Sequence, residues 1–211
     1  MCGRYHMGDG ATSEELQEII DAMNRGAYDG EIKTTGEIFP TDVVPVIASN
    51  RSRKPAVFPM AWGYTLPNGR RVINARSETA KDRPLFRDGM THRRCAIPAS
   101  HYFEWTHGGA VRDKYAIRPE TDSAIYMAGL YRLEQGMPTF VILTRAPSKA
   151  VSFLHDRMPV LLSREQIPAW IDPGRDPAPL LLQALGDVRV ERIAPETEQV
   201  RMTFCARRQR R

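Results

Sequence analysis

Short apolar segments separated by turn residues constrain the fold of this chain more than any other feature. Beyond the first 40 residues the apolar runs are brief and are interrupted by proline, glycine and charged residues. Runs of this kind are typical of strands, and Pro-Asn-Gly at 67–69 predicts a tight turn between two of them. We predict strands over 43–47, 56–62, 71–73, 95–97, 102–105, 115–118, 125–131, 140–144, 158–162 and 188–193.

Helical periodicity is confined to a few places. Thr12-Ser13-Glu14-Glu15 is a helix start, and the apolar residues that follow lie on one face up to about Arg25. Shorter helices are predicted over 146–154, 163–171 and 176–185. Many short strands with few helices predict an α+β fold, a single domain with an antiparallel β-barrel-like core and a few peripheral helices. We place this domain at 1–206 and expect 207–211, which hold four arginines, to form a disordered basic tail.

Composition excludes several classes of protein. The three cysteines, Cys2, Cys95 and Cys205, have no short spacing, which argues against a disulfide framework and a cysteine-based zinc site. We expect no metal and no cofactor. Long apolar runs and a signal-peptide pattern are absent from the sequence, so we expect a cytoplasmic protein without a membrane partner, nucleoid-associated if the source is bacterial. A monomer is the default expectation.

Charge is distributed unevenly along the chain. Residues 64–118 contain 11 Lys and Arg against 5 Asp and Glu, a net charge of +6, whereas the segments on either side are mildly acidic. This asymmetry favours an anionic partner, with nucleic acid first. Chance clustering on a solvated surface explains the charge pattern equally well.

Cys2 is the residue with the most distinctive chemistry. Removal of Met1, which a small second residue permits, leaves an amine and a thiol on one Cα. The α-amino group titrates near ~8, so a useful fraction is nucleophilic at neutral pH. Such a 1,2-aminothiol condenses with an aldehyde to give an imine and then a thiazolidine ring. The alternative is an accidental cysteine on a frayed terminus.

Three further segments place polar residues in apolar settings. INARSET (73–79) follows a strand and carries Asn74 and Arg76 on one face; IPASHYFEW (97–105) sets Glu104 between two aromatic residues; HDRMPVLL (155–162) begins with His155. Each has a structural alternative: Asn74 as a strand-end cap, Arg76 as a partner of Glu78, Glu104 as a surface carboxylate, and His155 as a helix C-terminal cap.

Together these segments resemble one family. MCGRY, GEIFPTD (36–42), AWG (61–63), INARSET, IPASHYFEW and HDRMPVLL follow the order found in the SOS-response-associated peptidase (SRAP) family, over roughly residues 1–171. The resemblance implies a protein of the DNA-damage response that crosslinks covalently to abasic sites in single-stranded DNA through Cys2, shielding the lesion. An autopeptidase or lyase activity is implied as well.

The resemblance also implies roles for individual residues. Cys2 is the nucleophile, Asn74 orients the terminal amine or the sugar, Glu104 transfers protons and His155 assists. Arg4 and Arg76 hold the flanking phosphates, and Trp62 and Pro40 contribute to DNA binding. The chain departs from the family at Glu37-Ile38-Phe39, where many relatives have an Asn before the Pro. It also lacks the wedge tryptophans after Trp-Gly, so that Tyr64 or Leu66 replaces the wedge, or none exists.

Two other functions stay open from sequence alone. A cysteine peptidase acting in trans would use Cys2 activated by His155. A noncatalytic single-stranded nucleic-acid-binding module would use the basic middle segment and the tail, and its affinity would follow salt and phosphate count.

Overall fold

A closed five-stranded barrel forms the core of the computed structural model, which describes residues 2–8, 14–25, 30–106, 112–120 and 124–194. The barrel strands are β3 (Val43–Ser49), β4 (Pro55–Trp62), β8 (Arg94–Ala99), β11 (Ile125–Glu134) and β12 (Met137–Arg145). They pair around the circle in the order β12-β4-β3-β8-β11, and β11 closes it by pairing with β12. All these pairs are antiparallel except β4–β12. The predicted fold class is confirmed.

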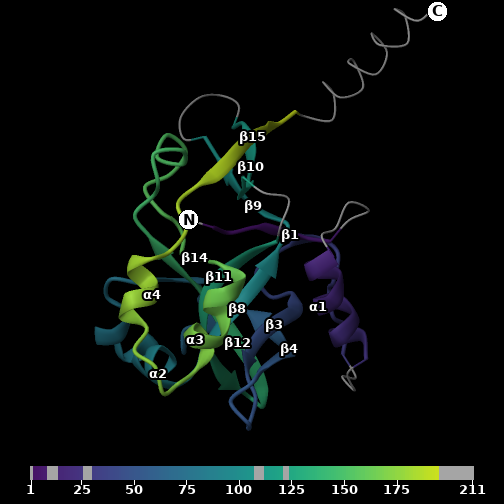
Figure 1. Cartoon of the computed structure of the whole chain (residues 1–211), viewed down its shortest axis with the longest axis vertical. Coiled ribbons are helices and arrows are strands. Elements are labelled where there is room, and N and C mark those ends of the chain that lie inside the picture. Colours follow the sequence, from purple (N-terminus) through teal and green to yellow (C-terminus); the bar gives the residue numbers. More distant parts are fainter. Residues whose placement is uncertain (1, 9–13, 26–29, 107–111, 121–123, 195–211) are drawn as a thin grey trace, which may run out of the picture.

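A second sheet lies against one end of the barrel. Its order is β15 (Val188–Ile193), β10 (Lys114–Pro119), β9 (His101–Trp105), β1 (Tyr5–Met7) and β2 (Gly36–Ile38). In Figure 1 this sheet occupies the upper part of the molecule, above the barrel strands. The first strand of the chain is therefore paired on both sides, to β2 and β9, and the residues that precede it are held between two layers.

Short strands complete the sheets. Strand β7 (Asn74–Arg76) runs parallel to β12, while β13 (Met158–Pro159) and β14 (Leu161–Leu162) extend the barrel sheet. A hairpin joins β5 (Tyr64–Thr65) to β6 (Arg71–Val72), and its turn is closed by the amide of Gly69 donating to the carbonyl of Leu66. The turn predicted at 67–69 is confirmed.

The helices lie around the barrel (Figure 1). Helix α1 (Glu14–Asn24) buries Leu16, Ile19, Ile20 and Met23, which confirms the predicted face over the described part of 12–25. The other helical segments are η1 (Ala80–Asp82), α2 (Pro84–His92), η2 (Arg164–Gln166), α3 (Ile167–Ile171) and α4 (Ala178–Leu182).

One predicted helix is wrong, and one helix of the structure was not predicted. Residues 149–154 form hydrogen-bonded turns instead of the helix predicted over 146–154, and their backbone bonds run to both the third and the fourth preceding carbonyl. Helix α2 was missed, although Pro84 at its first turn is a helix-start signal. Among the described residues, none of the helices has the length and apolar character needed to cross a membrane.

Candidate functional site

Cys2 lies inside the molecule, between the five-stranded sheet and the barrel. Its exposed fraction is 0%. The chain is fixed there by β1 and by Arg4 just before it, whose carbonyl accepts a hydrogen bond from the amide of Phe103 at 3.0 Å. Burial, and then the negative charge of Glu104, raise the pKa of the Cys2 thiol. The thiol is therefore protonated at neutral pH, and the end of the chain is not frayed.

Asn74 connects the barrel to this chain end. It begins β7, and its Nδ2 donates to the carbonyl oxygen of Cys2 at 2.9 Å. Its Oδ1 is buried and accepts no hydrogen bond from the described residues. A buried acceptor without a donor is unusual in a folded protein. The second oxygen of Asn74 is thus available to a group that enters the site.

Glu104 is buried on β9, with an exposed fraction of 4%. Its strand neighbour on β10 is Tyr115, and its charge acts on the Cys2 thiol. The alternative of a surface carboxylate is therefore wrong. A carboxyl group buried beside a thiol and between aromatic residues has the surroundings of a proton-transfer group.

His155 follows the turn segment and is largely buried, with 17% of its side chain exposed. The amide of Arg157 donates to its Nδ1 at 3.0 Å, which places the ring proton of a neutral imidazole on Nε2. The carboxylate of Asp156 also lies 2.6 Å from Nδ1 and would favour the imidazolium.

The segment that carries His155 lies near β10. The ring of Phe153, two residues earlier, contacts the ring of Tyr115 with centroids 5.7 Å apart. Tyr115 is in turn the strand neighbour of Glu104. Phe153 is 61% exposed, so an aromatic surface borders the site at this point.

Three further residues near Cys2, Asn74 and His155 lie within the segments singled out from the sequence, but no role was predicted for them. The hydroxyl oxygens of Tyr5 and Tyr102 are buried and bond to none of the described residues, and the charge state of Cys2 influences the pKa of both. Arg157 binds both oxygens of Glu78, at 2.8 and 2.7 Å, and the carbonyl of Thr144. The suggested Arg76–Glu78 pair is thus replaced by Arg157–Glu78.

The two predicted phosphate ligands differ in their surroundings. Arg4 pairs with Glu37 at 3.1 Å and lies between the rings of Phe39 and Trp105, 4.4 and 5.0 Å from their centroids. Arg76 is exposed at the end of β7. It lines a pocket of about 540 Å³ together with Asn74 and Thr144. Arg76 offers its guanidinium directly to solvent, whereas the side chain of Arg4 is partly covered and 33% exposed.

The structure corrects the prediction for Trp62 and leaves Pro40 open. Trp62 is 0% exposed, donates from Nε1 to the carbonyl of Ile73, and stacks on Phe140, so it is a core residue. Pro40 is half-buried in a turn pinned to the barrel by the amide of Thr41, which donates to the carbonyl of Trp62. Thr41 has a φ of +89°, a strained value for a β-branched residue.

Neither proposed wedge substitute is a simple replacement. Tyr64 is 1% exposed and packs on Phe86, so it is excluded as a wedge. Leu66 is half-buried at the start of the hairpin turn. Of the two, only Leu66 stays near the surface.

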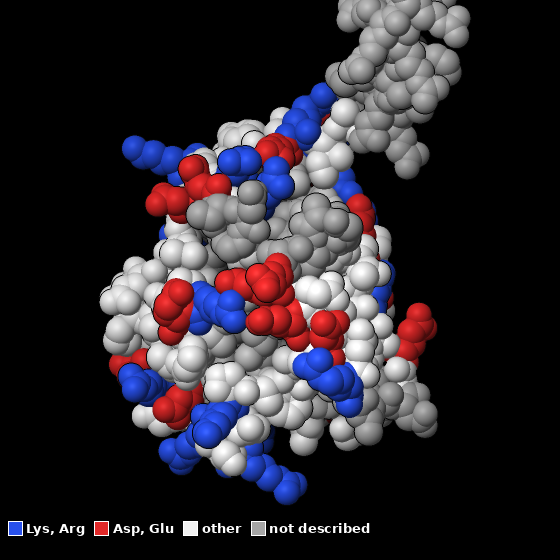
Figure 2. Space-filling view, turned by 45° about the vertical axis from the view of Figure 1, so that its right-hand side comes forward, with Lys and Arg blue, Asp and Glu red and all other residues white. Residues whose placement is uncertain are grey.

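The charged surface is mixed where it can be seen. On the face turned forward in Figure 2, acidic side chains gather beside basic ones. Arg164, for example, pairs with Glu15 at 2.8 Å and with Glu18 at 3.4 Å. A uniformly positive stripe is therefore not found on the described part of that face. A larger pocket of about 1100 Å³, lined by Glu78, Arg145 and Arg175 among others, includes none of the predicted site residues.

A family model and two curated relatives match this chain over most of its length. Residues 1–200 match the family model described as SOS response associated peptidase (SRAP). The abasic site processing protein YoqW of Bacillus subtilis (strain 168) is 29% identical over 199 residues, which cover 88% of this chain and 86% of that protein. The abasic site processing protein YedK of Escherichia coli (strain K12) is 29% identical over 179 residues, covering 81% and 79%.

Solved structures show the same fold. A protein from Bacteroides thetaiotaomicron superposes with a TM-score of 0.69 at 22% identity, covering 94% of both chains. A phage-related protein from Bordetella bronchiseptica gives a TM-score of 0.71 at 22% identity, covering 92% of this chain and 95% of that one.

Proposed function

The chain belongs to the SOS response associated peptidase (SRAP) family, and on that premise we propose that it captures abasic sites in single-stranded DNA through Cys2. Its curated relatives are named abasic site processing proteins. The product is a covalent thiazolidine link that shields the lesion. We propose that the protein acts as a monomer in the cytoplasm, and at the nucleoid if the source is bacterial.

The observation that carries this proposal is the position of the chain end. Cys2 is fully buried, its carbonyl is held by Asn74, and its thiol lies within the field of Glu104. A terminus of no function would lie in solvent. Here the five-stranded sheet contributes Glu104, and the barrel sheet contributes Asn74, to the surroundings of Cys2.

The reaction follows from the groups present. Removal of Met1 frees the α-amine, which attacks the aldehyde carbon of the ring-opened sugar. Loss of one water gives an imine. The sulfur then adds to the imine carbon, and its proton moves to the nitrogen, which closes the ring. Because the amine and the thiol belong to one residue, the second step is intramolecular and needs no further encounter.

The neighbouring side chains have separate tasks in this scheme. Glu104, as a carboxylate, takes a proton from the attacking amine and passes it to the departing oxygen, and His155 assists the transfer. The unpaired Oδ1 of Asn74 accepts a hydrogen bond from the freed amine, while its Nδ2 donates to the backbone carbonyl of Cys2. The protonated thiol suits a mechanism in which the amine acts first and sulfur follows.

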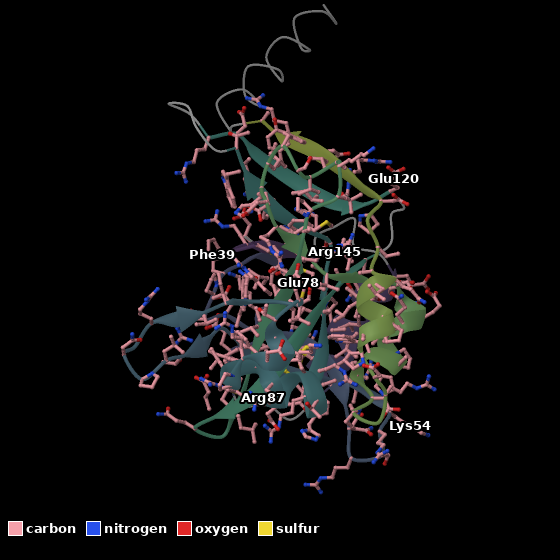
Figure 3. The ribbon with its side chains drawn as sticks, turned by 90° about the vertical axis from the view of Figure 1, so that its left-hand side faces the viewer. Phe39, Lys54, Glu78, Arg87, Glu120 and Arg145 are labelled. Carbon is pink, nitrogen blue, oxygen red and sulfur yellow. The ribbon has the colours of Figure 1, made fainter. Side chains whose placement is uncertain are left out.

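Single-stranded DNA suits the site better than duplex, because the sugar must leave the stack to reach a buried residue. The exposed rings of Phe153 and Phe39 offer stacking surfaces to unpaired bases. In Figure 3 Phe39 lies at the outer edge of the molecule, at the level where the sheet meets the barrel. Arg76 and Pro40 complete the proposed contacts to the strand.

The decisive experiment is intact mass spectrometry of the purified protein, alone and after incubation with a single-stranded oligonucleotide that contains one abasic site. The expected mass is that of the protein without Met1 plus the strand, less one water, at equimolar yield. Cys2→Ala should lose this stable adduct and keep noncovalent binding. An unchanged adduct in Cys2→Ala would exclude Cys2 as the nucleophile.

A peptidase acting in trans is less well supported. Cysteine peptidases depend on a thiol whose pKa is lowered, whereas burial raises that of Cys2. A single self-cleavage that releases residues before Cys2 is compatible with the main proposal. Multiple turnover on a peptide substrate would favour the peptidase, and equal binding of intact and abasic strands without a covalent product would favour a noncatalytic module.

A further inference from the structure

A carboxylate holds two cations together on the outer face of the five-stranded sheet. Glu37, on β2, pairs with Arg4 through one oxygen at 3.1 Å and with Lys114 through the other. Arg4 directly precedes β1, while Glu37 and Lys114 lie on β2 and β10, so the cluster joins parts of the chain that are far apart in sequence. Burial works against ionisation of Glu37, but its bonds to Lys114 and Arg4 lower its pKa overall.

Aromatic rings surround both cations. Lys114 lies 3.8 Å from the centroid of Phe103 and 5.9 Å from that of Trp105, and Arg4 lies over Phe39 and Trp105. The rings hold the cations in place without neutralising them. The Nε of Arg4 is buried and bonds to no acceptor among the described residues. The guanidinium therefore has a donor left over that Glu37 does not use.

We propose that Arg4 and Lys114 form a binding site for one phosphodiester of the DNA strand, and that Glu37 occupies this site until the phosphate displaces it. This inference rests on the proposed function and adds Lys114 as a phosphate ligand and Glu37 as its competitor. A carboxylate is planar and a phosphate is tetrahedral, but both carry anionic oxygens that bind the paired N–H donors of arginine.

The position of the cluster fits a phosphate next to the lesion. Arg4 is only two residues from Cys2, so their Cα atoms can lie at most about 7 Å apart. The side chains of Arg4, Glu37 and Lys114 keep 33%, 32% and 23% of their surface exposed, so an incoming anion can reach them. The Nε of Arg4 is buried as the side chains stand, so a phosphate oxygen can bind it only if the guanidinium turns when Glu37 leaves.

The exchange predicts that the native carboxylate weakens DNA binding. The test is fluorescence anisotropy with a single-stranded oligonucleotide that carries tetrahydrofuran, an abasic analogue without the aldehyde, so that binding is separated from chemistry. Glu37→Gln should bind about three- to tenfold more tightly than the wild type, because two partly exposed ion pairs no longer compete. The plot of log affinity against log salt should steepen by about one. Adding Lys114→Gln to this variant should reverse both changes.

Glu191→Gln is the matched control. Glu191 pairs with Arg118 at 2.6 Å on the same sheet, and its replacement changes the net charge by the same amount. An equal gain in Glu191→Gln, or no gain in Glu37→Gln, would overturn the phosphate site. The proposed function is judged separately, by crosslinking to an authentic abasic strand. If the phosphate site is overturned but the wild type still crosslinks, the proposed function stands. If neither the wild type nor any variant binds or crosslinks, the proposed function fails. Should Glu37→Gln melt well below the wild type, Lys114→Gln alone gives the second test, with weaker binding and a shallower salt slope expected.

Discussion

The two nucleophilic atoms of Cys2 have separate tasks, and replacing sulfur with oxygen distinguishes them. Cys2→Ser keeps the α-amine and a side chain of nearly the same shape. We expect an imine that borohydride traps, but no adduct that survives denaturation without the reductant, because the hydroxyl is a poorer nucleophile than the thiol for ring closure. Denaturing electrophoresis measures the trapped imine when borohydride is added and the stable adduct when it is left out. Cys95→Ala, at the other buried cysteine, should keep the full adduct. A reductant-independent product from Cys2→Ser would show that sulfur is not needed.

Glu104→Gln should change thiol reactivity and crosslinking in opposite directions. The charge of Glu104 is one of the causes that raise the pKa of the Cys2 thiol, so removing it lowers that pKa and increases the thiolate fraction at a given pH. Iodoacetamide should therefore label Cys2 faster in the variant. Crosslinking should slow by about 10²-fold or more, because the proton donor is lost. Peptide-resolved mass spectrometry measures the labelling. Parallel changes in both rates would mean that Glu104 acts only on the thiol.

At the scale of elements, Arg94 ties two helices to the barrel. Its buried guanidinium, 2% exposed, donates to the carbonyls of Met90 and Thr91 at the end of α2 and of Trp170, Asp172 and Arg175 at and beyond α3. Arg94→Lys cannot reach all five, and each buried carbonyl left without a donor costs about 1–3 kcal/mol. We expect a loss of about 2–4 kcal/mol in the free energy of unfolding.

Chemical denaturation measures this loss. Arg175→Lys serves as the control, since that side chain is 68% exposed and should change stability little. Equal stability of Arg94→Lys and the wild type would mean that water or a rearranged lysine satisfies the carbonyls.

The elements also show what the sequence can and cannot reveal. Strand and turn patterns predicted the barrel class, and the motifs singled out Cys2, Asn74 and Glu104, which the structure brings together. Local periodicity failed at 146–154, where turns replace a helix, because the competition between bonds to the third and the fourth preceding carbonyl is not visible in an apolar pattern. The Glu37–Lys114 pair was out of reach, since it depends on two strands, β2 and β10, that lie in one sheet without being adjacent.

Burial was the other quantity that motifs did not predict. Trp62 was assigned to DNA from its place beside Gly63, yet it fills the barrel end between Tyr5 and Phe140. An aromatic residue in a motif has two uses, packing and recognition, and only the three-dimensional neighbours decide between them.

At the scale of the whole molecule, one row of residues runs across the barrel to the site. Strand pairing places Cys95 opposite Gly129, Gly129 opposite Ile142, and Ile142 opposite Asn74. Asn74 in turn holds the carbonyl of Cys2. The spacing of β8, β11 and β12 therefore sets where the amide of Asn74 lies. A substitution in the middle of the row should therefore shift the position of Asn74 relative to Cys2.

Gly129→Ala tests this connection. A Cβ at Gly129 would lie 2.4 Å from Ile97 Cδ1, 2.8 Å from the Val141 carbonyl oxygen and 3.1 Å from Cys95 Sγ. Because the barrel is closed, β11 has no free edge toward which to move, and overpacking of this kind costs about 1–3 kcal/mol. For a domain of this size we expect the melting temperature to fall by about 3–10 °C. Gly186→Ala, where the nearest atom to the new Cβ is 3.7 Å away, should melt close to the wild type. Below its melting temperature, Gly129→Ala should also crosslink abasic DNA more slowly than Gly186→Ala, since the strain displaces Asn74. A variant that is less stable but crosslinks at the wild-type rate would show that the barrel supports the fold without positioning the site.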